Sequence, residues 1–307
     1  MSTPPIAVGV DGGGTTFRAV ALDAQGAEIG RAEVPSALVL AGLPGPAVTA
    51  LKDLLGQLCE VAGVQLPVAT LWAGIAGAGR EAVRAELEAE LGRARIAHRV
   101  RVGTDVEAAF EDAFAGGPGI LVMAGTGSIA YGRAEDGREG RVGGWGSMLG
   151  DEGSGYAIGI EALRRVARSV DGRGQPTQLG RLVLIHLGLG DPDDLITWAS
   201  TASRSAIAGL VPVVQSSAAA GDDVSGEILV RAVENLEGHA LTLLSSLGPW
   251  QHAPSVALGG GLLDPSGPLR RPLERILRSQ NVPMLDRVLD PPRGAARKAM
   301  VTEAVKA

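Results

Sequence analysis

The chain has 307 residues, of which 45% are apolar and 20% charged, so it is long enough for two globular domains and too apolar for a disordered protein. Its net charge is −6 and its basic residues form no cluster, which argues against a nucleic-acid partner. The single cysteine, Cys59, excludes a disulfide framework, a cysteine-rich zinc site and a cysteine-ligated iron–sulfur cluster within one chain.

The first five residues lack the basic and apolar regions of a signal peptide. No apolar run in the sequence approaches the roughly 20 residues of a membrane span. We therefore expect a cytoplasmic protein that has no membrane partner.

A glycine-rich string, Asp11-Gly12-Gly13-Gly14-Thr15-Thr16, lies between two predicted strands at residues 6–10 and 17–23. Three glycines let a backbone approach a bulky anion and point its N–H groups at it, and the threonine hydroxyls add donors. Asp11 stands where a carboxylate could hold Mg²⁺, directly or through water. The unit predicts a phosphate-binding hairpin for a magnesium nucleotide, with a ligand-free hairpin as the alternative.

Two better-known phosphate loops do not fit this hairpin. A Walker loop requires the string G-x-x-x-x-G-K-[ST], which does not occur in the sequence. A dinucleotide fingerprint requires a helix directly after the glycines, and here a strand follows.

The rest of the first half alternates strands and helices. A helix at 47–62 is predicted by one apolar face and is ended by Gly63. Another helix opens at Thr104-Asp105-Val106-Glu107. The breaker Gly116-Gly117-Pro118-Gly119 marks a domain boundary. The other predicted elements are strands at 27–34, 67–75 and 99–103 and a surface helix at 81–91.

The second half repeats the opening design. Residues 120–124 predict a buried strand, Gly125-Thr126-Gly127-Ser128 a turn, and residues 129–134 a strand that runs to the hairpin dipeptide Asp136-Gly137. That dipeptide leaves no room for the helix of a dinucleotide site, although residues 125–130 match G-x-G-x-x-A. The other predicted elements are helices at 154–170, 175–188, 204–220, 223–247 and 267–279, strands at 254–258 and 284–289, a glycine turn at 259–261 and a closing helix from 294.

Three glycine turns at strand ends, two of them in repeated hairpins, resemble the superfamily of actin, hexokinase and heat-shock chaperone ATPases. Within it, the chain resembles the N-acetylglucosamine kinase family, also called the BadF-type ATPase family. The residues that carry this resemblance are 9–16, Thr104-Asp105, 124–128 and, above all, Gly143-Gly144-Trp145-Gly146 through Gly150-Asp151-Glu152-Gly153-Ser154.

The resemblance implies an α/β fold of two actin-like ATPase domains of the ribonuclease H type. Each domain is expected to contain a mixed five-stranded sheet, and the ligand cleft is expected between the domains. We expect the N-terminal domain over residues 1–115, completed by the C-terminal helix 294–307, and the C-terminal domain over residues 116–293.

The resemblance also implies roles for single residues. Asp105 matches the catalytic base and a contact to the sugar. The other residues that match sugar contacts are Gly144, Trp145, Gly146 and Asp151. Thr15 and Thr126 match contacts to the phosphates of ATP. The other residues of the two glycine turns that are predicted to bind ATP and its phosphates are Gly12, Gly13, Gly14, Thr16, Gly125 and Gly127. Those expected near the adenosine are Gly259, Gly260, Gly261 and, by a weaker alignment, Ala208.

Several of these residues have a structural alternative. Asp105 could be only a carboxylate at a helix start, with Thr104 as the cap, and Asp151 only a turn residue before the next helix. Trp145 is interpreted as a packing residue, because the backbone of its glycine neighbours can bind the sugar. Glu107 and Glu152 could lie near a metal or simply on a solvated face.

One residue departs from the family pattern. Leu38 stands about where the family has an asparagine that contacts the sugar. Because leucine cannot hydrogen-bond a hydroxyl, either this loop aligns differently or the substrate differs from N-acetylglucosamine.

The activity that the resemblance implies is ATP-dependent phosphorylation of an amino sugar, N-acetylglucosamine or glucosamine, at the 6-hydroxyl. Mg²⁺ is the implied cofactor, ATP the co-substrate and a homodimer the implied assembly. One alternative is a conformational switch, such as the activator of 2-hydroxyacyl-CoA dehydratase, which a single cysteine disfavours. Another is a regulator without turnover, which an intact Asp105 disfavours.

Overall fold

The computed structural model describes residues 6–13, 16–35 and 44–304, the last three by their backbone only. The chain divides into two compact units, Met1–Gly117 together with Leu289–Ala307, and Pro118–Val288. The boundary between them falls inside the glycine-rich breaker at 116–119, and the last helix of the chain belongs to the first unit. Leu38 lies outside the described residues.

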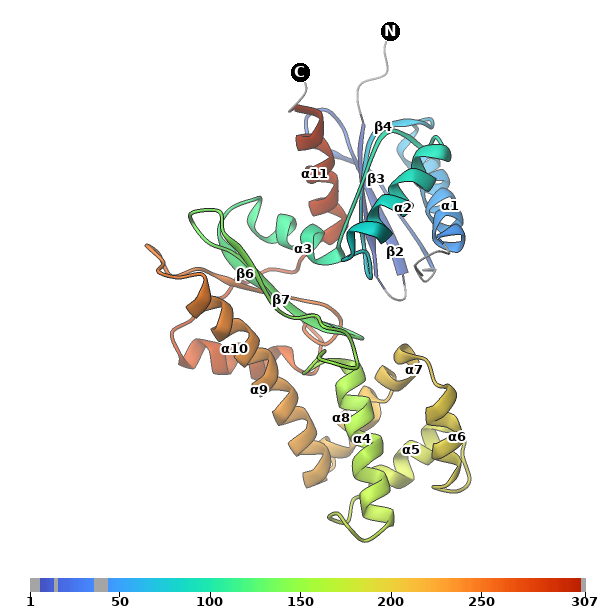
Figure 1. Ribbon diagram of the computed structural model, residues 1–307, viewed down its shortest axis with the longest axis vertical. Coiled ribbons are helices and arrows are strands. Elements are labelled where there is room, and N and C mark those ends of the chain that lie inside the picture. Colours follow the sequence, from blue (N-terminus) through green and yellow to red (C-terminus); the bar gives the residue numbers. More distant parts are fainter. Residues whose placement is uncertain (1–5, 14–15, 36–43, 305–307) are drawn as a thin grey trace. The chain divides into compact units, whose positions relative to one another are not determined.

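The first unit is a mixed sheet with helices on both faces (Figure 1). Its elements are β1 (Ala7–Gly12), β2 (Thr16–Leu22), β3 (Glu28–Pro35), α1 (Gly45–Ala62), β4 (Val68–Ile75), α2 (Glu81–Arg93), β5 (Ala97–Gly103), α3 (Asp105–Phe114) and α11 (Pro291–Ala304). The five strands have the order β3-β2-β1-β4-β5, with β1 antiparallel to β2 and parallel to β4.

Strand β1 is buried along its whole length, as its continuous apolar run predicts. Successive side chains of a strand point to opposite faces of the sheet. Val8 and Val10 therefore share one core with Leu51 and Leu55 of α1, whereas Ala7 packs on the other face. Figure 1 shows α1 and α11 on opposite sides of this sheet.

Helix α11 can lie directly on β1 because small residues meet there. Ala295 and Ala299 share a core with Ala7 of β1 and Trp72 of β4. A Cβ added to Gly9 would stand only 1.9 Å from the backbone nitrogen of Ala296. The last helix of the chain is thus built into the sheet that carries the first glycine turn.

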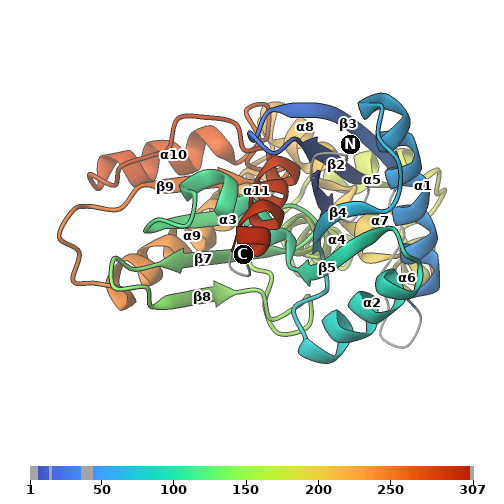
Figure 2. The ribbon, with the colours of Figure 1, turned by 90° about the horizontal axis from the view of Figure 1, so that it is seen from above.

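The second unit has a four-stranded mixed sheet and seven helices. Its elements are β6 (Gly119–Ala124), β7 (Ser128–Arg133), β8 (Glu139–Gly143), α4 (Gly155–Val170), α5 (Leu179–Leu187), α6 (Asp194–Thr201), α7 (Arg204–Ala208), α8 (Val211–Ala219), α9 (Asp223–Ser246), β9 (Val256–Gly259) and α10 (Arg270–Ser279). The strand order is β8-β7-β6-β9, and Figure 2 shows β7 and β8 side by side. Strand β6 is antiparallel to β7 and parallel to β9, so the opening hairpin design is repeated as predicted.

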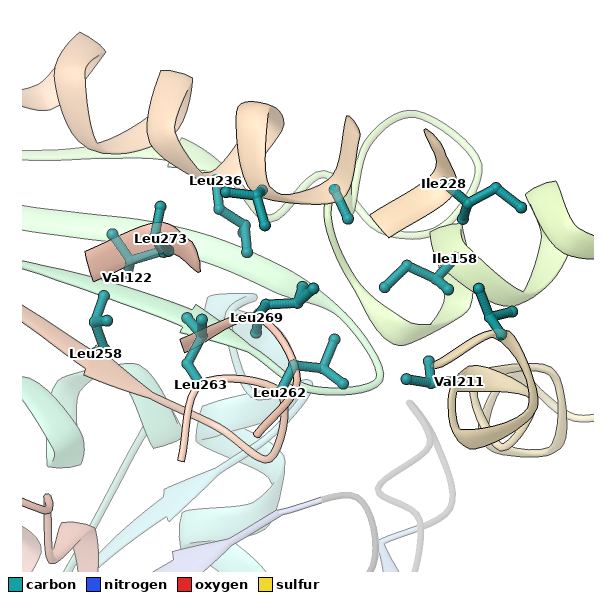
Figure 3. Packing of buried hydrophobic residues seen from close by; sticks show 14 of the residues in the cluster. Val122, Ile158, Val211, Ile228, Leu236, Leu258, Leu262, Leu263, Leu269 and Leu273 are labelled. Carbon is teal, nitrogen blue, oxygen red and sulfur yellow. The ribbon is translucent and has the colours of Figure 1, made fainter. Parts of the chain in front are cut away.

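The core of this unit joins the sheet to its helices. Val122 of β6 and Leu258 of β9 lie close to Leu273 of α10 and Leu236 of α9 (Figure 3). Helix α9 keeps the helical spacing of apolar residues read from the sequence, and its inner face is buried.

The expectation of five strands in this second sheet is wrong. Residues 284–289, predicted as a strand, form only an isolated bridge between Met284 and Val256. The backbone of Val256 bonds to the carbonyl of Pro283 and the N–H of Leu285. Pro283 has no N–H, so the ladder cannot extend on the side that precedes Met284, and on the other side the pairing does not continue past Leu285.

Two further differences concern helices. The helix predicted over 204–220 is divided into α7 and α8, and Pro212 occupies the first turn of α8, where its missing N–H costs no hydrogen bond. Helix α6 was not predicted from the sequence. None of the helices in the described part of the chain combines the length and the apolar character that a bilayer crossing requires.

Candidate active site

The first glycine turn places a buried carboxylate at the end of β1. Asp11 is paired in register with Arg18 of β2, and Nη2 of Arg18 donates to Oδ2 of Asp11 at 2.6 Å. Burial raises the pKa of Asp11, and the guanidinium of Arg18 opposes that shift. The N–H of Gly13 donates to the carbonyl of Thr16 at 3.2 Å, which narrows the turn.

Gly12 ends β1 beside Ile75, and a Cβ on it would stand 2.5 Å from Cδ1 of Ile75. The lack of a side chain at Gly12 therefore makes room for the side chain of Ile75 at the end of the strand. Gly14 and Thr15, predicted to contact phosphate, lie outside the described residues.

Asp105 is the first residue of α3. Thr104 caps this helix as predicted, because its hydroxyl accepts the N–H of Glu107 at 3.2 Å. Asp105 is partly buried, and its pKa is raised to about 6, first by loss of solvent and second by the negative charge of Asp11. The carboxylates of Asp11 and Asp105, both singled out from the sequence, therefore interact electrostatically within the first unit.

Glu107 holds the start of this helix in place. Its carboxylate lies 3.4 Å from the N–H of Thr104 and completes a capping box, and Nη1 of Arg84 lies 3.7 Å from it. A Cβ on Gly103 would stand 2.3 Å from Oε2 of Glu107. The string Thr104-Asp105-Val106-Glu107 carries the S/T-x-x-E signature of this motif, so the role of Glu107 was readable from the sequence.

The second glycine turn joins β6 to β7 and is tied to the start of α4. The N–H of Gly125 donates to the carbonyl of Gly127 at 2.9 Å. The N–H groups of Gly155 and Tyr156 donate to the carbonyls of Gly125 and Thr126 at 2.8 and 3.2 Å. The turn at 125–127 and the N-terminus of α4 are therefore joined directly by backbone hydrogen bonds.

Two other residues that are predicted to lie near the nucleotide pack close to this turn and to the start of α4. Gly260 of the third glycine turn has φ +88°, and a Cβ on it would stand 2.5 Å from the carbonyl oxygen of Ala124. The Cβ of Ala208 lies 3.1 Å from the position of a Cβ on Gly155. The structure thus brings the turn at 125–127, the turn at 259–261 and Ala208 together within the second unit.

Asp151 is buried and tightly engaged. Nη2 of Arg204 donates to its Oδ2 at 2.6 Å, and the backbone N–H groups of Ser128 and Gly146 favour its charged form. Burial nevertheless raises its pKa. Oδ2 of Asp151 also stands 3.2 Å from the position of a Cβ on Gly127. The helix after it is capped by Ser154, not by Asp151.

The loop before Asp151 exposes large apolar side chains. Trp145 is 64% exposed, Met148 92% and Leu149 77%. The guanidinium carbon of Arg141 lies 5.0 Å from the centroid of the Trp145 ring. The interpretation of Trp145 as a packing residue is therefore wrong. Gly144 and Gly146, on either side of it, both have positive φ.

Two arginines that contact the candidate site were missed in the sequence. Arg18 stands directly opposite Asp11 across a hairpin, so counting the register back from the turn could have found it. Arg204 lies on α7, far along the chain from Asp151, and no local pattern connects them.

The two-unit α/β architecture and the repeated glycine hairpins define an actin-like ATPase fold. The chain belongs to the BadF/BadG/BcrA/BcrD ATPase family, whose model matches residues 8–289.

The relatives of this chain include amino sugar kinases. It is 30% identical over 314 aligned residues to an N-acetyl-D-glucosamine kinase of Dictyostelium discoideum, which covers 96% of this chain and 98% of the relative. It is 30% identical over 237 residues to the glucosamine kinase GspK of Vibrio cholerae, covering 77% and 79%. The crystal structure of a candidate N-acetylglucosamine kinase from Chromobacterium violaceum has a TM-score of 0.79 at 28% identity and covers 97% of this chain and 98% of its own.

Proposed function

We propose that this protein transfers the γ-phosphoryl group of ATP to a hydroxyl of an amino sugar, with Asp105 as the general base. Membership of an ATPase family and the names of the relatives support this proposal. The observation that carries it is the placement of Asp105 at the capped start of α3, close enough to Asp11 for the two charges to interact. Transfer to the 6-hydroxyl and a homodimeric assembly are proposed on the resemblance alone.

The electrostatics suit a base that works near neutral pH. A carboxylate with a pKa of about 6 is mostly ionised at pH 7 and accepts a proton more readily than an ordinary aspartate. In the proposed step the sugar hydroxyl attacks the γ-phosphorus, its proton passes to Asp105, and ADP leaves with the bridging oxygen.

The residues present fit a magnesium ion at the first turn. Mg²⁺ in kinase sites takes one or two carboxylates and otherwise water and phosphate oxygens. Asp11 supplies such a carboxylate, directly or through water, and the charge it places near Asp105 is one that a divalent cation would offset. When bound, Mg²⁺ neutralises charge on the phosphates. Among the described residues no cluster of three or more His, Cys, Asp or Glu offers a separate metal cage.

The remaining roles are assigned unit by unit. In the first unit, the turn at 12–16 is proposed to contact phosphate, and in the second unit the turn at 125–127 does the same. Ala208 and the turn at 259–261 are proposed to lie near the adenosine. Gly144, Trp145, Gly146 and Asp151 are proposed as the sugar loop. Because Asp151 already accepts a hydrogen bond from Arg204, we propose that it holds this loop in shape as well as contacting the sugar.

The test is release of ADP from Mg-ATP in the presence of a panel of sugars: N-acetylglucosamine, glucosamine, N-acetylmannosamine, N-acetylmuramic acid and glucose. We expect release that depends on one amino sugar and is abolished by EDTA. Release that ignores every sugar would contradict the proposal and favour a switch ATPase. No release with any sugar would leave a regulator without turnover as the better account.

The acid side of the pH profile gives a separate prediction. Asp105 must be ionised to accept a proton, so kcat/KM should fall as the pH drops through about 6, roughly tenfold for each unit below it. An acid limb near pH 4, the ordinary range of an aspartate, would show that its environment does not raise its pKa in solution. Stability is followed in parallel, so that acid unfolding is not mistaken for loss of the base.

A further inference from the structure

Arg204 stands beside the second glycine turn, although nothing in the sequence connects the two. It is the first residue of α7, and its side chain is 52% exposed. Its Nη2 donates to Oδ2 of Asp151, and that same oxygen lies 3.2 Å from the position of a Cβ on Gly127. Asp151 therefore bridges the guanidinium to the turn at 125–127.

A second chain of contacts places Arg204 at the same point. The guanidinium carbon of Arg204 lies 5.9 Å from the centroid of the Tyr156 ring. The backbone N–H of Tyr156 donates to the carbonyl of Thr126 in that turn at 3.2 Å. Arg204 is thus anchored from two sides to the turn that is proposed to bind phosphate.

The turn at 125–128 has no positively charged side chain of its own, and Arg204 can supply one. The turn residues Gly125-Thr126-Gly127-Ser128 include no basic side chain, so their own groups offer a phosphate only neutral donors. A guanidinium carries five N–H donors in a planar fork. One edge of the group can therefore donate to a carboxylate while another edge donates to a phosphate. Half of the Arg204 side chain is exposed and available for this second contact.

We propose that Arg204 is a nucleotide-binding residue that contacts a phosphate group of the bound nucleotide while it holds Asp151 in place. The inference rests on the proposed nucleotide site of this unit. It also explains the pairing of Arg204 with Asp151. The buried carboxylate fixes the orientation of the Arg204 side chain, so that less conformational freedom is lost when the nucleotide binds.

The test measures binding of ADP by calorimetry in the absence of any sugar. We expect Arg204→Gln to weaken ADP binding about 10- to 100-fold, the usual effect of losing a charge-assisted hydrogen bond, and Arg204→Lys to recover only part of it. Adenosine, used as a competitor, should bind equally well to wild type and variant. Arg271→Gln, which removes an exposed charge on α10, is the matched control and should bind ADP normally.

Arg204→Gln leaves the buried Asp151 without its cation, so the effect could arise from a distorted loop. Asp151→Asn and the double variant Arg204→Gln/Asp151→Asn separate these causes. If Arg204 contacts phosphate, the double variant binds ADP at least tenfold more weakly than Asp151→Asn. Equal ADP affinity of these two variants overturns the inference, as does wild-type affinity in Arg204→Gln. Failure of the wild-type protein to bind ADP would instead contradict the proposed function.

Discussion

Asp105→Asn is expected to lose most of its turnover and yet to be more stable than the wild type at neutral pH. Asparagine keeps the size of the side chain but cannot accept the proton, and a general base typically contributes ~10²–10⁴-fold to the rate. The loss should appear in kcat, measured as sugar-dependent ADP release.

The gain in stability follows from the raised pKa of Asp105. The folded protein binds this proton more tightly than the unfolded chain, because the pKa is about 6 in the fold and 3.8 for an unperturbed aspartate. Folding therefore disfavours the ionised form. The cost is fully present above about pH 6 and disappears below about pH 4. Asparagine avoids it, so we expect a gain of about 1–3 kcal/mol in the free energy of unfolding at pH 8 and little difference at pH 4.

Asp112→Asn is the matched control in the same helix. Asp112 is buried, accepts the N–H of Asp290 at 2.8 Å and lies 3.6 Å from Arg297. Its replacement should lower stability by about 1–2 kcal/mol and leave turnover near normal, the reverse of the result for Asp105. Near-normal turnover in Asp105→Asn would remove Asp105 from the role of base. Destabilisation of Asp105→Asn at pH 8 would show that the negative charge of Asp105 is compensated in the folded wild type.

Much of the fold could be predicted because its strands, turns and helices are encoded by local sequence patterns. Strand β1, the β1–β2 hairpin and its repeat at β6–β7 follow from short apolar runs interrupted by glycine, and α9 from an apolar face kept over many turns. The start of α3 at Asp105 was equally local, since Thr104 is a strong cap. Signals of this kind depend only on neighbours in the sequence.

Contacts between distant segments were not predictable in this way. Asp151 could be singled out by its motif, but its pairing with Arg204 depends on where α7 lies in the fold. Trp145 is exposed in the fold, whereas composition alone favours burial of a tryptophan. A fifth strand was predicted for the second sheet from the residues at 284–289, but only Met284 pairs there, because pairing depends on how this segment runs beside β9.

Gly9→Ala is expected to be strongly destabilising, although it adds a single methyl group to a strand. The new Cβ would stand 1.9 Å from the nitrogen of Ala296 and 2.3 Å from the carbonyl oxygen of Pro292. Both are backbone atoms of α11, so no side chain can rotate to make room. The helix must move away from β1, which opens the core formed by Ala7 and Ala299.

Overpacking a core usually costs about 1–3 kcal/mol, and a clash with backbone should reach about 3 kcal/mol or more. A protein of two units need not unfold in one step, so hydrogen exchange of the α11 amides is the sharper measurement, with urea unfolding beside it. Gly56→Ala in α1 is the control: no atom of the described residues lies within 4 Å of its added Cβ, and alanine should stabilise that helix by up to about 1 kcal/mol. If Gly9→Ala exchanged its α11 amides as slowly as Gly56→Ala, the helix would not be docked on β1. The return of the chain terminus to the first unit would then contribute little to the sheet that carries Asp11.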